Sequence, residues 1–210
     1  MNKRAIHRIS GLIITFFIGI HLFNHVHSIF GADKHIELMT HLRGFYRTIF
    51  VETALVLAVL VQISSGLTLF FDQRKKAISI FDKLQLWTGL YLAGFLIIHL
   101  TAVFTGRIFL NLDTNFYFGA AGLNTFPANL FFIPYYSLAI ISFFGHIAAI
   151  HSKKMKQNIL GLTPSSQSKI ILTIGVCLTF VILYGLTNHF QGVTIPKAYD
   201  ILIGKSLVSG

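Results

Sequence analysis

Two histidines occupy matching positions in two long apolar stretches of the chain. His21 stands ten residues after Gly11, and His99 stands ten residues after Gly89. A polar side chain inside a stretch long enough to cross a bilayer is costly unless it has a partner, so such residues mark candidate functional sites. The repeated spacing predicts that the two histidines are halves of one site.

The first stretch carries a stripe of polar residues. Positions i, i+3, i+4 and i+7 form one helix face, and here they are His21, Asn24, His25 and Ser28. Two imidazoles on separate helices at equal depth can hold a metal ion from opposite sides, as haem iron is held inside helix bundles. We therefore predict that His21 and His99 ligate a haem b, an arrangement that leaves no open iron position and favours electron transfer. Two alternatives remain: zinc or copper on His21 and His25, or histidines that only hydrogen-bond neighbouring helices.

The elements that must position these residues are membrane-spanning helices. The chain is 54% apolar and only 11% charged, which is typical of an integral membrane protein. Five apolar stretches have about the 20 residues that a bilayer requires: 7–29, 49–71, 84–105, 131–151 and 169–188. We predict a single all-α transmembrane domain whose first four helices form the haem-binding bundle, with Gly19 and Gly94 leaving room for the macrocycle.

The connecting segments carry other patterns. The mixed pattern of residues 30–48 favours a short interfacial helix. The segment 106–132, rich in glycine, asparagine and aromatic residues, is predicted to be an ordered cap at the membrane surface. The tail 190–210, which contains Gly192 and Pro196, is predicted to be weakly structured.

Charge and cysteine content exclude several functions. Cys177 is the only cysteine, so the chain can form no internal disulfide and hold no iron–sulfur cluster. The net charge of +10 comes from residues beside the apolar stretches, which indicates membrane topology and lipid contacts rather than nucleic acid. Eleven of the 17 basic residues fall on one predicted side: Lys3, Arg4, Arg8, Arg74, Lys75, Lys76, Lys83, Lys153, Lys154, Lys156 and Lys169. This excess places the N-terminus in the cytoplasm, in a protein that we expect in a bacterial inner membrane.

A second polar layer is predicted in the inner half of the membrane. Gln62 on the second helix and His146 on the fourth lie at matching depths, with an amide where an imidazole would complete a second pair. Glutamine is a poor haem ligand, so we expect one haem. This layer is either a hydrogen bond between His146 and Gln62 or a pocket for a quinone headgroup. Arg8 and Ser10, at the inner end of the first helix, could serve a quinone carbonyl or a haem propionate, although Arg8 could equally extend to the lipid headgroups.

The remaining polar residues are predicted at the membrane surface. The predicted helix ends carry a group of ionisable side chains that we expect to be solvated there: His35, His41, Glu52, His151 and His189.

These residues resemble the cytochrome b membrane anchor of succinate:quinone oxidoreductases and fumarate reductases. The likeness consists of the His-Arg-Ile-Ser-Gly sequence at 7–11, the two Gly-to-His steps and the position of His146. It is greatest for the single-chain, five-helix form, which carries two b haems. In that family the outer haem is held from helices one and three, which corresponds to His21 and His99. The inner haem is held from helices two and four, where His146 matches and Gln62 does not.

The resemblance implies a redox function. It implies a haem b subunit that exchanges electrons with quinone and anchors flavoprotein and iron–sulfur subunits in the membrane, with Arg8 and Ser10 at quinone-side positions. The alternative is a diverged relative with one haem or none, which serves as a membrane scaffold or as a subunit of an unrelated membrane complex.

Overall fold

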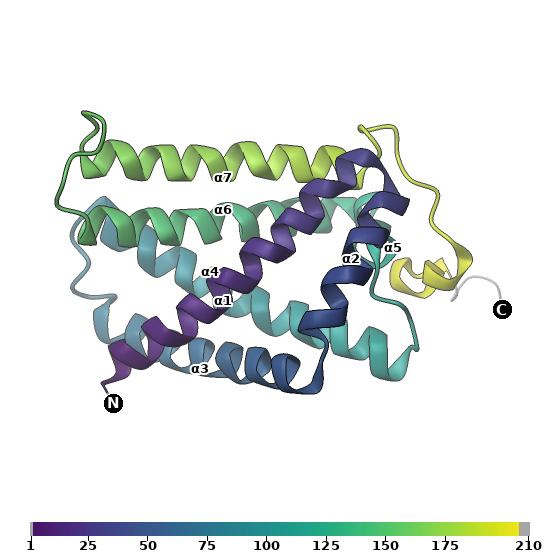
Figure 1. Cartoon of the computed structure of the whole chain (residues 1–210), viewed down its shortest axis with the longest axis horizontal. Helices are drawn as coiled ribbons and strands as arrows, with labels where there is room; N and C mark the ends of the chain where they lie inside the picture. Colours follow the sequence, from purple (N-terminus) through teal and green to yellow (C-terminus); the bar gives the residue numbers. More distant parts are fainter. Residues whose placement is uncertain (1, 206–210) are drawn as a thin grey trace.

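Five long helices dominate the structure (Figure 1). The computed structural model describes residues 2–205, and within that range it contains helices but no β-strand. The long helices are α1 (Lys3–Val26, continued by the 3-10 turn η1, His27–Phe30), α3 (Ile49–Gln73), α4 (Ile80–Phe104, continued by the π turn η2, Thr105–Phe109), α6 (Asn129–Lys154) and α7 (Pro164–Leu186). The prediction of an all-α fold with five potential spans is confirmed.

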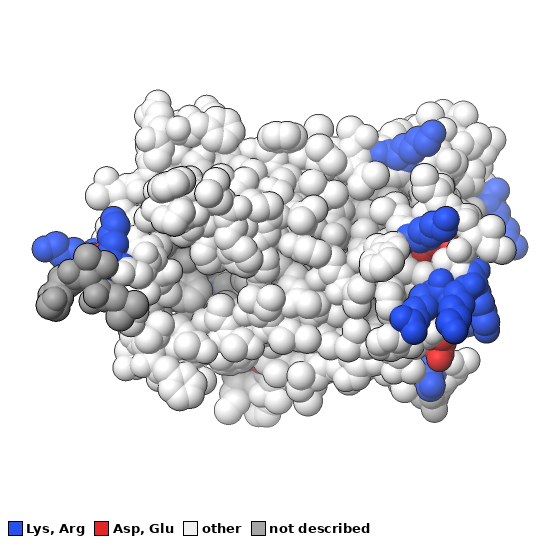
Figure 2. Space-filling view, turned by 180° about the vertical axis from the view of Figure 1, so that it is seen from behind, with Lys and Arg blue, Asp and Glu red and all other residues white. Residues whose placement is uncertain are grey.

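The surface of the bundle is that of a membrane protein. Figure 2 shows a broad band without charged residues between two ends, with lysine and arginine gathered mainly at one of them. Large apolar side chains are exposed along the band, among them Leu12, Phe16 and Phe180, at 63–70% of their full area. Such exposure would be unfavourable in water but matches lipid. We call the end that holds the N-terminus, the α3–α4 loop and the α6–α7 loop the basic end, and the opposite end the cap end.

Several helices begin earlier than the apolar patterns predicted, because capping residues start them. Asn2 accepts a hydrogen bond from the Arg4 amide at 3.1 Å, which starts α1 four residues before the predicted boundary. Ser79 and Asp82 form a reciprocal capping box that starts α4. The extra turns carry polar residues at the basic end.

The order of packing places the two histidine-bearing helices across the bundle from each other. Helix α1 packs against α3 and α7, whereas α4 packs against α3 and α6, and α6 lies along α7. Helices α1 and α4 therefore meet through side chains rather than through close backbone packing.

Two short helices cover the cap end. Gly31, with φ of 101°, reverses the chain after η1, a conformation that glycine adopts without steric cost. Helix α2 (Ala32–Tyr46) then folds back against the bundle, so a helix within 30–48 is confirmed. Helix α5 (Phe116–Leu123) lies inside the predicted cap 106–132. It contributes to a buried core with α6 and α7 whose members are Phe116, Ala120, Leu123, Ile140, Ile182 and Leu186.

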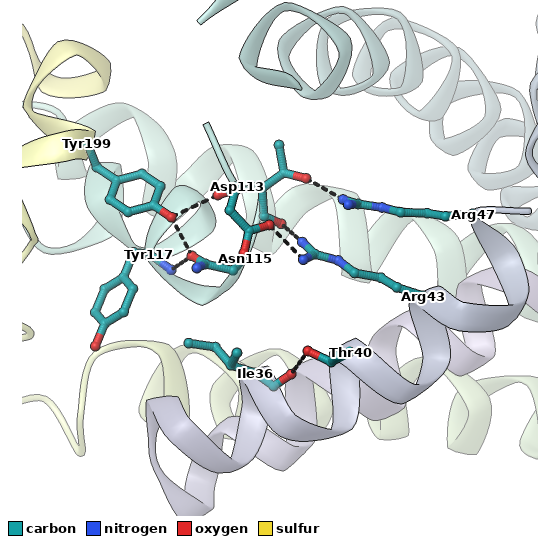
Figure 3. Close-up of polar contacts among 9 residues, drawn as sticks. Ile36, Thr40, Arg43, Arg47, Asp113, Asn115, Tyr117 and Tyr199 are labelled. Atoms are coloured by element: carbon teal, nitrogen blue, oxygen red, sulfur yellow. Dashed lines mark hydrogen bonds and ion pairs between the residues drawn. The ribbon is translucent and has the colours of Figure 1, made fainter. Parts of the chain in front are cut away.

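The tail is more ordered than predicted. Residues Lys197–Ile203 form the 3-10 helix η3, whose Tyr199 is 6% exposed. The Tyr199 hydroxyl lies 2.9 Å from the main-chain oxygen of Asp113 and 2.9 Å from Oδ1 of Asn115 (Figure 3). The prediction of a weakly structured tail is wrong for this segment, because a long-range polar contact that the local sequence does not encode holds it.

The loop residues 113–115, which contact Tyr199, are also held by α2 from the other side. Arg43 donates to the Asp113 carboxylate at 2.7 Å and to the Thr114 carbonyl at 2.5 Å, and Arg47 donates to the Thr114 hydroxyl at 2.6 Å (Figure 3). Residues 113–115 are thus tied both to α2 and to η3, which closes the cap end.

Tyr199→Phe should loosen this closure. The variant removes the hydrogen bond donated by the hydroxyl, while Asn115 Oδ1 keeps the bond from the Tyr117 amide, so the change should cost about 1 kcal/mol of stability. The thermal midpoint of the purified protein in detergent measures the change. Tyr184→Phe, on a tyrosine that is 41% exposed, is the matched control and should leave the midpoint in place. An unchanged midpoint for Tyr199→Phe would show that the contact does not stabilise the tail.

Candidate functional site

The structure brings His21 and His99 together. Their ring centres lie 6.2 Å apart, with the ring planes inclined by 68°. Each ring is also stacked on a phenylalanine of its own helix: Phe17 lies 5.8 Å from His21, and Phe95 lies 5.2 Å from His99. The phenylalanines lie one turn from the histidines, so the helical repeat itself places each pair.

This separation fits one iron atom between two axial imidazoles. Two metal–nitrogen bonds of about 2.0 Å, with about 1.1 Å from each ring nitrogen to its ring centre, put the centres about 6 Å apart. The two rings come from different helices, α1 and α4, which are not among the closely packed helix pairs of the bundle. The donor set of two imidazoles within an apolar band suits a low-spin haem iron.

His25 competes for one of these nitrogens. Its Nε2 lies 3.1 Å from Nε2 of His21, and the ring centres are 4.5 Å apart. A nitrogen that shares a proton with its neighbour cannot ligate a metal at the same time, so ligation by His21 requires this hydrogen bond to break. The Nδ1 atom of His25 is buried without a hydrogen-bond partner among residues 2–205, so His25 has unused capacity of its own.

His35 belongs to this cluster, contrary to the prediction that it is solvated. It lies on α2 and is 1% exposed. Its Nε2 is 3.2 Å from Nδ2 of Asn24, and its ring packs 5.4 Å from those of His25 and Phe116. The sequence did hold a signal, because His35 and the apolar Met39 stand four residues apart and so share one helix face.

Burial of His35 makes the stability of the folded chain depend on pH. The apolar surroundings, followed by the nearby His21 and the Arg43 guanidinium, lower the pKa of His35 from 6.5 to about 4. The folded chain therefore binds this proton more weakly than the unfolded chain does. The stability contributed by neutral His35 is complete above pH 6.5 and is lost as the pH falls toward 4.

We expect the stability to fall by up to about 3 kcal/mol between pH 6.5 and pH 4 on account of His35. His35→Gln keeps a polar side chain but cannot titrate, so its thermal midpoint should depend less on pH in this range. His41→Gln, at an exposed position on the same helix, should retain the wild-type dependence. Equal slopes for His35→Gln and wild type would contradict the assignment.

The prediction that Gly19 and Gly94 leave room for a macrocycle between His21 and His99 is wrong. A Cβ atom at either position would meet nothing within 4 Å, and both glycines are exposed. However, Gly19 is two residues from His21 and Gly94 is five residues from His99, so they lie about 200° and about 140° around their helix axes. The two glycines therefore do not form the walls of a space between the imidazoles.

The zinc or copper alternative finds no further ligands. A structural zinc site needs four ligands and a catalytic site needs three from the protein. No group of three or more His, Cys, Asp or Glu side chains in the described part of the chain is arranged to hold a metal ion. His21 and His25 therefore do not complete such a site.

A second polar cluster joins α1 to α3 near the basic end. The Ser10 hydroxyl donates to Oε1 of Gln62 at 2.6 Å. The ring of His7 lies between Nε2 of Gln62 at 3.2 Å and the Ser65 hydroxyl at 2.9 Å. Ser10 and Gln62 were both predicted to be polar site residues, but their meeting across α1 and α3, and the part that His7 plays, were not predicted.

His146 forms no hydrogen bond with Gln62, so of the two alternatives for this layer the hydrogen bond between them is wrong. His146 lies against α4 instead: Nδ1 is 3.0 Å from the Gln85 carbonyl and 3.3 Å from the Thr88 hydroxyl. A Cβ atom at Gly89 would come within 3.0 Å of the His146 ring. The reason is the order of packing, since α6 lies beside α4 whereas Gln62 faces α1.

Other predicted positions have mixed outcomes. Arg8 is exposed and makes no hydrogen bond among the described residues, and His41 and His189 are exposed. His151 is half-buried and bonds Oε1 of Gln167 at 2.8 Å, so its predicted solvation is wrong. Glu52 is also not freely solvated, because it forms an ion pair with Arg107.

Comparisons with family models, with curated proteins and with solved structures find no match in any of the three. The fold and surface by themselves define the class of protein. The chain is a multi-pass α-helical membrane protein with a cluster of half-buried histidines around the buried His35 near the cap end, and a serine–glutamine–histidine cluster near the basic end.

Proposed function

We propose that this chain is the cytochrome b membrane-anchor subunit of a complex like succinate:quinone oxidoreductase or fumarate reductase. In this proposal a haem b lies between His21 on α1 and His99 on α4, and electrons pass to or from quinone. The observation that carries the proposal is the proximity of these two rings, whose centres are 6.2 Å apart although they come from different helices.

The chain's own residues have defined tasks in this proposal. His21 and His99 would hold the iron, and Phe17 and Phe95, stacked on them, fix the ring orientations and exclude water. The bound group would supply one-electron transfer without an open coordination position. Asn24 and His35, which contact each other at 3.2 Å, brace the end of α1 that carries His21.

Partners must supply the rest of the electron path. With one cysteine the chain holds no iron–sulfur cluster, so flavoprotein and iron–sulfur subunits would dock at the basic end. Eleven of the 17 lysines and arginines lie at that end, which favours a cytoplasmic orientation in a bacterial inner membrane. A quinone headgroup would find hydroxyl and amide donors in the cluster of His7, Ser10, Gln62 and Ser65.

A difference spectrum tests the proposal. The full chain, expressed with adequate haem supply and purified in detergent, should show a reduced-minus-oxidised spectrum of low-spin b type. Pyridine haemochrome quantification should give one haem per chain, because Gln62 bonds Ser10 rather than facing His146. A colourless preparation would overturn the proposal, and two haems per chain would overturn the count.

The Nε2–Nε2 hydrogen bond between His21 and His25 supports a second candidate function. In this candidate the histidines only hold α1, α2 and α4 together, and the chain is a membrane scaffold or a subunit of an unrelated complex. It predicts a haem-free preparation that nevertheless loses stability when His21 or His25 is changed. Haem content therefore separates the two candidates.

A further inference from the structure

A groove opens at the basic end between the end of α3 and the start of α4. Its volume is about 140 Å³, and it is lined by Phe70, Arg74, Ala77, Lys83, Leu86 and Trp87. A space that holds one water needs only about 10–15 Å³ of such volume, so the groove has room for several waters or for one phosphate group. It lies on the opposite end of the bundle from the histidine cluster.

The charge in this groove is uncompensated. Arg74 and Lys83 are exposed, and neither forms an ion pair within residues 2–205. Asp82, although adjacent to Lys83 in sequence, is paired with Lys153 at 2.6 Å. The lining contains no acidic residue, so two cations face one small space with nothing of opposite charge.

The rest of the lining is apolar and aromatic. Trp87 is 64% exposed, and its ring packs edge-on against Phe70 with centres 5.9 Å apart. Trp87 lies two turns into α4, which is the level at which tryptophan marks the boundary between headgroups and acyl chains. The groove thus offers cations toward water and an apolar wall toward the membrane.

A ligand that matches both features is an anion attached to a hydrocarbon chain. We infer that this groove binds an anionic phospholipid, with the phosphate between Arg74 and Lys83 and an acyl chain along Leu86 and Trp87. A protein partner is less well matched, because the groove is small, about 140 Å³, and lies at the level of the lipid headgroups. The inference requires only that the bundle spans a membrane and does not depend on haem.

Trp87 provides the test, because it is the only tryptophan in the chain. The full chain is reconstituted in phosphatidylcholine vesicles that contain, at equal mole fraction, either phosphatidylglycerol or phosphatidylcholine with brominated acyl chains, which quench tryptophan on contact. Wild-type fluorescence should be quenched more strongly by the phosphatidylglycerol. The preference should fall about fivefold in R74Q and in K83Q, and about 30-fold in the double variant.

The controls separate this groove from general surface charge. K154Q/K156Q removes two exposed charges from the same end and should keep the preference. Raising NaCl from 0.1 M to 1 M shortens the screening length from about 10 Å to about 3 Å and should weaken the wild-type preference, which tests the inference even if the variants do not fold. Equal quenching by the two lipids, or a preference that survives R74Q/K83Q, would overturn the inference. Loss of the preference on replacing chloride by inorganic phosphate at constant ionic strength would show a free-phosphate site and would also overturn it.

Discussion

Purified His99→Ala protein should lack the low-spin b-type absorbance that we expect of the wild-type chain. His99 supplies one of the two imidazoles, its ring lies 6.2 Å from that of His21, and alanine offers no lone pair in its place. Low-spin iron requires two strong axial ligands, so removing one should eliminate the signal rather than reduce it in proportion. The measurement is the reduced-minus-oxidised spectrum, normalised to protein.

Three further variants make this result specific. His21→Ala should give the same loss, whereas His41→Ala, on an exposed histidine of α2, should keep the full signal. His25→Ala should also keep it, because it removes only the hydrogen bond that competes for Nε2 of His21. If His25→Ala loses the signal and His21→Ala retains it, the ligand on α1 is His25. Monodisperse elution and helical circular dichroism establish that each variant is folded.

Gly185→Ala should lower the thermal midpoint by about 5 °C. A Cβ atom on Gly185 would overlap the Ser28 hydroxyl and lie 2.7 Å from the Ile29 amide nitrogen, so main chain rather than a flexible side chain would have to move. Overpacking of this kind costs about 1–3 kcal/mol. The gain in helix propensity on replacing glycine by alanine is at most about 1 kcal/mol, so the overlap decides the sign.

The shift of η1 that Gly185→Ala causes should also move the histidine cluster. Ser28 donates to the His25 carbonyl at 2.6 Å, so movement of η1 away from α7 moves the end of α1. We therefore expect Gly185→Ala to lower haem content as well as stability. Gly44→Ala is the matched control, because that helical glycine has nothing within 4 Å of the added carbon and the change should be neutral or stabilising. Equal midpoints for the two variants would contradict the close contact of α7 with η1.

The sequence by itself determined the class of fold. Apolar stretches of membrane-spanning length predicted the five long helices, and the helical repeat correctly grouped His21, Asn24, His25 and Ser28 on one face. Both results follow from physics that acts along the chain: the length that crosses a bilayer and the 3.6-residue turn. The meeting of His21 with His99 was also predicted, because depth in a membrane can be counted in residues.

Only the tertiary structure decided which helices are neighbours. In a membrane both the lipid-facing and the core-facing sides of a helix are apolar, so hydrophobic periodicity says little about how each helix is rotated or what it packs against. For this reason Gln62 was paired with His146, whereas it bonds Ser10 and His146 bonds the Gln85 carbonyl. For the same reason His35 was placed in solvent, although the fold of α2 over α1 buries it against Asn24.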